Sequence, residues 1–195
     1  KGNDLFIGNS GTDTAVIAGG GGEAVDLADY NFFSLTVNGN GVAFGTIVGP
    51  DGTETLSGIE VIKVANTDDD GNSTFLVRDG MSIQAAINAA EAGDTVNLLS
   101  GTYTGNLTID KELTLSGPNA GFTGFDAARG DEATIEGVLT IAADGVTVDG
   151  VRVDGGTADS SPIDLGNAAD VTIQNSVVLG EGNDGGGIST WTSAN

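Results

Sequence analysis

The fold is decided by residues 82–117, SIQAAINAAEAGDTVNLLSGTYTGNLTIDKELTLSG, where the pattern of a short helix gives way to that of several short strands. Ser82 suits a helix N-cap, and Gly93 is a stop signal. Between them, an apolar stripe at i, i+3, i+4 and i+7 predicts an amphipathic helix of about three turns. The stripe consists of Ile83, Ala86, Ile87 and Ala90. After Gly93, apolar and polar residues alternate, which predicts strands. These segments are 95–99, 107–109 and 113–115.

The strand pattern repeats downstream at a spacing of 25 or 26 residues in three tracks. The echoing segments are 113–117 (LTLSG) with 146–150 (VTVDG) and 171–175 (VTIQN), 151–153 with 177–179, and 163–165 with 188–190. A unit of three short strands cannot bury its apolar side alone, whereas equal units stacked in parallel can. The sequence therefore predicts an all-β fold, a right-handed parallel β-helix whose first turn is capped by a short α-helix.

Several motifs resemble a known group of proteins. SIQAAI (82–87), AGDTV (92–96), LTLSG (113–117) and GVTVDGVRV (145–153) are similar to the N-terminal turns of the pectin-lyase-like superfamily of extracellular β-helix proteins. Its periplasmic copper-protein-like and pectinesterase-like members are the most similar. The resemblance covers about residues 78–190 and implies the fold rather than an activity, because one fold hosts many chemistries.

Composition narrows the range of partners. The 195 residues include 28 Asp and Glu against six Lys and Arg, which gives a net charge of −22. Such a field repels nucleic acids and anionic membranes and favours cations. The chain has no cysteine, hence no disulfide framework, and no apolar run of about 18 residues, so we expect no membrane span. The first residues do not have the pattern of a signal peptide, so we expect none here.

The start of the chain carries a nine-residue repeat, in which Gly2 and Asp4 recur as Gly11 and Asp13. This spacing resembles the glycine-rich RTX repeats of secreted calcium-binding proteins, in which aspartates and exposed carbonyls bind Ca²⁺. The resemblance implies Asp4 and Asp13 as ligands in a degenerate β-roll end; a solvated glycine turn is the alternative. Alternating residues in 28–66, with turn signals at 38–41 and 49–52, predict a β-hairpin cap. We therefore expect domains at 1–75 and 76–195.

A second candidate calcium site lies in the linker TDDDGNS (67–73). Asp68, Asp70 and Asn72 occupy alternate positions, an oxygen-rich spacing that suits a hard cation. The glycine comes too early for an EF-hand-like loop, and no glutamate follows at the twelfth position. A solvated turn is the alternative.

The most enzyme-like segment is VTVDGVRVDG (146–155), where the valines should face inward and Asp149, Arg152 and Asp154 outward. An arginine between carboxylates suits lyase chemistry on an acidic sugar, but it is more often a surface ion pair. The chain has no histidine, and so lacks the histidine-dependent sites of polygalacturonase-like and alginate-epimerase-like relatives. In the loop 118–132, Phe122 and Phe125 suit either a sugar platform or a pin that holds the loop on the coil.

Two functions remain open at this stage. The first is a structural or adhesive segment of a secreted, calcium-dependent bacterial surface or matrix protein, exported by a type I system as the RTX resemblance implies. The second is the N-terminal part of a polysaccharide-active β-helix enzyme of the lyase, epimerase or esterase type. Expected partners are Ca²⁺, a carbohydrate polymer or a cell surface. The last predicted strand carries no cap, so Ile188 and Trp191 are expected at an end-to-end contact with another copy.

Overall fold

The computed structural model describes residues 3–18, 30–32, 34–50, 52–65, 71–155, 161–180 and 187–190. Over these residues the protein is an all-β structure with a single helix, α1 (Ile83–Ala89). The strands before the helix are β1 (Leu5–Ile7), β2 (Thr14–Ala18), β3 (Thr36–Val37), β4 (Ala43–Gly49), β5 (Gly52–Ile59), β6 (Val61–Ala65) and β7 (Thr74–Val77). The strands after it are β8 (Thr95–Leu98), β9 (Gly101–Thr104), β10 (Leu107–Ile109), β11 (Thr114–Ser116), β12 (Ala133–Glu136), β13 (Leu139–Ile141), β14 (Thr147–Asp149), β15 (Arg152–Asp154), β16 (Ile163–Asp164), β17 (Thr172–Gln174), β18 (Val177–Leu179) and β19 (Ile188–Ser189).

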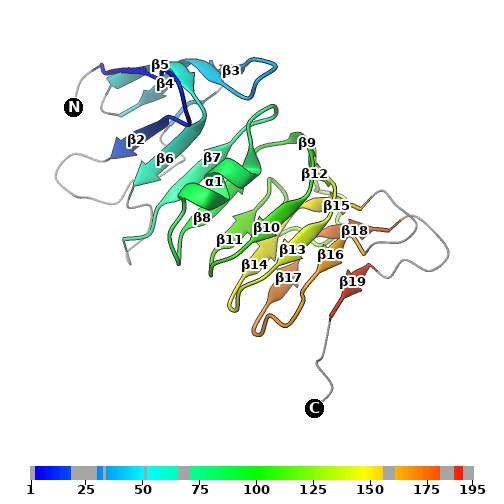
Figure 1. Cartoon of the computed structure of the whole chain (residues 1–195). Helices are drawn as coiled ribbons and strands as arrows, with labels where there is room; N and C mark the ends of the chain where they lie inside the picture. The colour runs from blue at the N-terminus through cyan, green and yellow to red at the C-terminus, as the bar shows by residue number, and fades with distance from the viewer. Residues whose placement is uncertain are drawn as a thin grey trace.

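From β8 onward, successive strands enter three parallel sheets in turn (Figure 1). The first sheet receives β8, β11, β14 and β17, the second receives β9, β12, β15 and β18, and the third receives β10, β13, β16 and β19. Every third strand therefore lies beside its counterpart from the previous circuit. This arrangement pairs the backbone of each circuit with the next one, as the repeats predicted.

The register of the first sheet follows the sequence repeat. Thr114 pairs with Thr147, and Thr147 pairs with Thr172, so the threonines form a ladder along the outside of the sheet. Their inward neighbours include Leu115 and Val148, which are fully buried. The third track pairs as predicted, residues 163–164 with 188–189. The second track is shifted by one residue from the predicted alignment, because residues 152–154, and not 151–153, pair with 177–179. The alternation of polar and apolar residues thus places a continuous aliphatic core inside the three sheets.

The helix α1 has the predicted start and apolar face but is shorter than predicted. The Ser82 hydroxyl accepts a hydrogen bond from the Ala85 N–H at 3.1 Å, which makes Ser82 the N-cap. The stripe Ile83, Ala86, Ile87 and Ala90 is at most 5 % exposed. The helix has seven residues rather than about three turns, because Ala90 is already extended (φ −72°, ψ 155°). Gly93, with φ +91°, lies in the turn that follows.

The N-terminal part combines parallel and antiparallel pairs. The two predicted turns join antiparallel strands, β3 with β4 and β4 with β5. β1 pairs in parallel with β5, and β2 pairs in parallel with β6. β2, β6 and β7 extend the first sheet to seven strands, with β6 and β7 antiparallel. Because β7 spans the predicted boundary after residue 75, this sheet connects the N-terminal part directly to the coil (Figure 1).

Candidate functional site

The two N-terminal aspartates lie in the turns before β1 and β2, and each contacts a glutamate far along the chain, Glu54 in β5 or Glu60 directly after β5. The backbone N–H of Asp4 donates to the Glu54 carboxylate at 3.0 Å, and that of Asp13 donates to the Glu60 carboxylate at 2.8 Å. Asp13 also accepts a hydrogen bond from the Asn9 N–H at 2.9 Å. Sequence patterns did not identify either glutamate, since they lie 50 and 47 residues away along the chain.

Of the three candidate calcium ligands in the linker, the structure describes only Asn72. Asp68 and Asp70 lie outside the described residues. The Asn72 side chain lies against Gly93, where an added Cβ would be 2.7 Å from the Asn72 Oδ1. Within the described part of the chain, no three Asp, Glu, His or Cys residues gather closely enough to hold a metal ion.

The enzyme-like segment is divided between two sheets. Val148 and Val153 point inward, as predicted, and are fully buried. The Arg152 guanidinium lies 3.4 Å from the Asp154 carboxylate, with about a third of each side chain exposed. Asp149 instead lies on the first sheet, where its carboxylate accepts hydrogen bonds from the next circuit's amides, Gln174 at 3.0 Å and Asn175 at 2.8 Å.

The residue that sequence reasoning missed beside Arg152 is Glu136. It is exposed and pairs in register with Asp154, so two carboxylates and one arginine share the outer face of the second sheet. A search for repeats would have found Glu136, since IEG at 135–137 precedes the next strand much as VDG does at 153–155.

The loop 118–132 is fixed by Arg129. Its guanidinium donates to both carboxylate oxygens of Glu132 at 2.9 Å, to the Phe122 carbonyl at 2.7 Å and to the Asn175 carbonyl at 2.6 Å. The Phe125 side chain is completely exposed, with a relative exposure of 104 %. Phe125 therefore does not pin the loop, and the arginine holds it instead.

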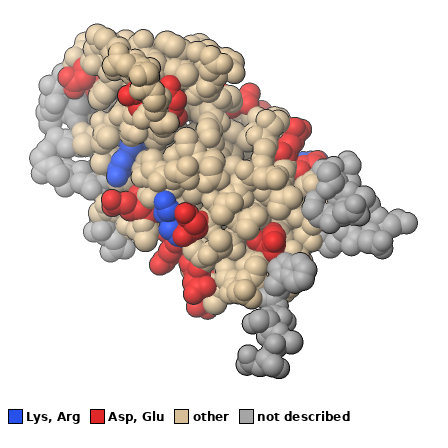
Figure 2. Space-filling model, in the orientation of Figure 1, with Lys and Arg blue, Asp and Glu red and all other residues tan. Residues whose placement is uncertain are grey.

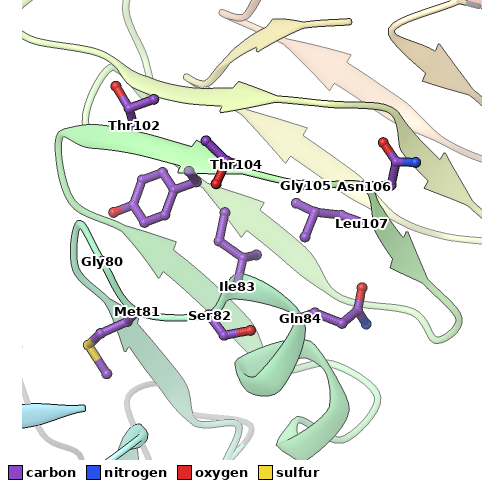
Figure 3. A pocket seen from close by; sticks show the side chains of 11 residues that line it. Gly80, Met81, Ser82, Ile83, Gln84, Thr102, Thr104, Gly105, Asn106 and Leu107 are labelled. Carbon is purple, nitrogen blue, oxygen red and sulfur yellow. The ribbon is translucent and has the colours of Figure 1, made fainter. Parts of the chain in front are cut away.

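Two cavities flank the turn between β7 and α1. The junction cavity, about 490 Å³, is lined by Tyr30, Phe32, Arg78, Asp79, Leu99, Ser100 and Pro118. The helix cavity, about 320 Å³, lies between the start of α1 and the β9–β10 segment (Figure 3). Sequence reasoning identified neither cavity, because their walls come from separate segments of the chain.

Tyr103 lines the helix cavity, and backbone carbonyls hold its hydroxyl. Its hydroxyl donates to the Leu99 carbonyl at 2.7 Å, and the Val77 carbonyl lies at 3.1 Å. Burial raises the pKa of this hydroxyl, the negative charge of Asp79 raises it further, and Arg78 opposes the rise. Tyr103 is therefore a neutral structural hydrogen-bond donor.

On the face that Figure 2 shows, most residues are uncharged, and acidic residues predominate over basic ones among the charged residues. In the part of the chain that the structure describes, no helix is long and apolar enough to cross a membrane.

Comparisons of the chain with protein-family models, with curated proteins and with solved structures gave no match.

Proposed function

We propose that the chain is a right-handed parallel β-helix that serves as a structural or adhesive segment of a secreted, calcium-dependent bacterial surface or matrix protein. The observation that supports this best is the in-register stacking of strands from β8 to β19. Each circuit of such a coil adds about 4.8 Å along one axis. A coil of this kind is a stiff rod, because every circuit contacts the next. A rod that carries polar ladders on its outside suits spacing and surface display.

Calcium dependence rests on the nine-residue repeat around Asp4 and Asp13 and on the net charge of −22. The neighbouring Glu54 and Glu60 bring further carboxylate oxygens to these turns. Oxygen donors of this kind suit Ca²⁺, which takes six to eight oxygen ligands at about 2.4 Å. Backbone carbonyls, water or an adjacent turn would have to supply the remaining oxygen ligands of the Ca²⁺ ion. The linker with Asp68, Asp70 and Asn72 is the second candidate.

The test is amide hydrogen exchange during a calcium titration, with magnesium as the comparison ion. A ligand that binds only the folded state adds about 2.7 kcal/mol at a hundredfold excess over its dissociation constant. Protection should therefore rise around Asp4 and Asp13 and be lost in Asp13→Asn. The matched control is Asp126→Asn, an exposed aspartate in the loop 118–132. If calcium leaves exchange at both N-terminal turns unchanged, the roll is not a calcium site, and a response at 67–73 would place the site in the linker.

Secretion follows from the same proposal. RTX-type proteins resemble this chain at residues 1–17 and leave the cell through type I systems, so folding would be completed by external calcium. Circular dichroism of the purified chain in a chelator and after calcium addition tests this. An identical folded state at nanomolar and millimolar calcium would contradict it.

The alternative is a polysaccharide-active β-helix, and the cluster of Arg152, Asp154 and Glu136 favours it. Incubation with polygalacturonate, alginate and pectin, followed by assays for unsaturated ends, epimer ratio and methanol, distinguishes the two functions. We expect no turnover from these residues, because the 3.4 Å ion pair occupies Arg152 at the surface. If the protein turns over one of these polysaccharides and Arg152→Ala abolishes that activity, the enzymatic function is established.

A further inference from the structure

One wall of the junction cavity is a pair of stacked aromatic rings. The ring centroids of Tyr30 and Phe32 are 6.1 Å apart, with an interplanar angle of 24°. Asn31, between them, exchanges backbone hydrogen bonds with Val48 at 2.7 and 3.1 Å, which aligns this segment along β4. The Tyr30 ring lies over Gly49, where an added Cβ would come within 2.3 Å of it. Both aromatic side chains are therefore positioned by the hairpin and are only half-buried.

Another wall of the cavity carries one positive and one negative group, Arg78 and Asp79. The Arg78 guanidinium donates a hydrogen bond to the Phe32 carbonyl at 2.9 Å, which links this wall to the aromatic one. Asp79 is exposed, and one of its carboxylate oxygens lies 3.3 Å from the Thr102 backbone nitrogen. Arg78 forms no ion pair with a carboxylate among the described residues. Arg78, Asp79 and the hydroxyl-bearing Ser100 thus all line the cavity.

This combination selects the chemical class of the ligand. Aromatic faces pack against the C–H face of a sugar ring, and planar charged groups bind its hydroxyls from the side. Arg78 disfavours a cationic ligand, while Asp79 and the net charge of −22 disfavour an anionic one. A neutral, hydroxyl-rich ring with one apolar face satisfies both walls.

The neighbouring helix cavity extends the surface beyond one sugar unit. It is separated from the junction cavity by Asp79 and the adjacent Gly80. Its polar lining includes Ser82, Thr102, Thr104 and Asn106, without any charged side chain (Figure 3). Hydroxyl and amide groups beside an aromatic subsite suit a second sugar of the same polymer.

We propose that the junction cavity binds one unit of a neutral polysaccharide and that the helix cavity contacts the next unit. The proposal deepens the adhesive function proposed above, and rests on it for the idea that the chain has a polymer partner. It places binding at the junction of the N-terminal part and the coil, away from the Arg152 cluster and from the loop 118–132.

The test is isothermal titration calorimetry with cellotetraose, mannotetraose and xylotetraose, with tetragalacturonate as the charged comparison. We expect at least one neutral tetrasaccharide to bind, and Tyr30→Ala to weaken it by at least tenfold. Ser100→Trp fills the cavity from an exposed position without removing a packed side chain, and should abolish binding while the melting temperature stays unchanged. The matched control is Phe125→Ala, which removes a fully exposed aromatic outside both cavities and should leave affinity unchanged.

The outcomes separate this inference from the proposed function. Absence of binding to every neutral probe, retained affinity in Ser100→Trp, or loss of affinity in Phe125→Ala would each overturn the cavity assignment. Tighter binding of tetragalacturonate would refute the charge argument. Titrations repeated in a chelator separate the two ideas, since sugar binding without any calcium response would retain the cavity while refuting the calcium-dependent role.

Discussion

Replacement of Asp94 by alanine should produce a large loss of stability. Asp94 is only 3 % exposed, and its carboxylate accepts two backbone hydrogen bonds, from Ser73 at 2.7 Å and from Glu91 at 2.8 Å. These bonds join the residue before β7, the end of the helical segment and the start of β8. A hydrogen bond to a charged group contributes about 1.5–3 kcal/mol. Because water can reach part of the vacated site, we expect Asp94→Ala to lower the free energy of unfolding by about 3–4 kcal/mol.

Urea unfolding at pH 7, followed by circular dichroism, measures this loss as a lower midpoint at constant m-value. Asp94→Asn should lose less, since its amide oxygen still accepts one of the two N–H groups. The control is Asp110→Ala, whose side chain is 63 % exposed and 3.7 Å from the Lys111 amine, so its effect should stay within about 0.5 kcal/mol. A loss in Asp94→Ala no larger than in Asp110→Ala would refute the reasoning.

Three further changes test other contacts. Burial raises the pKa of Tyr103 above its usual value of about 10. The stabilisation by the neutral hydroxyl is therefore complete below about pH 10 and is lost as the pH rises through the pKa of the folded state. The free energy of unfolding should fall less steeply with alkaline pH in Tyr103→Phe than in the unchanged protein. Lys111→Met removes an ammonium 3.0–3.4 Å from three carbonyls at the end of α1, and should cost about 1–2 kcal/mol and speed amide exchange in that helix. Gly117→Ala would place a Cβ 2.3 Å from the Gly150 carbonyl oxygen and should cost more than about 2 kcal/mol in a thermal melt, whereas Gly130→Ala, in open space, should change the melting temperature little. Equal stability of the two glycine variants would contradict the close stacking of circuits.

The sequence predicted the periodic features of the fold because they depend on local patterns. Alternation alone determines which residues of a short strand face the core, so Val148 and Val153 were correctly placed inside. The 25-residue repeat likewise predicted which strands pair, since each circuit must align with the next. The N-cap at Ser82 required only its immediate neighbours. The early end of α1 was missed because the chain must turn toward β8 before the apolar stripe ends.

Only the tertiary structure decided which side chains meet across separate segments. Asp149 and Arg152 are three positions apart, yet the turn at Gly150, with φ +70°, sends them to different sheets. Conversely, Phe32 and Arg78 meet across 46 residues of chain. A sequence pattern specifies the direction of a side chain relative to its own strand, whereas the partners of that side chain depend on how the circuits and the hairpin stack. The residues of the core could therefore be predicted from the sequence, whereas the residues that line the junction cavity could not.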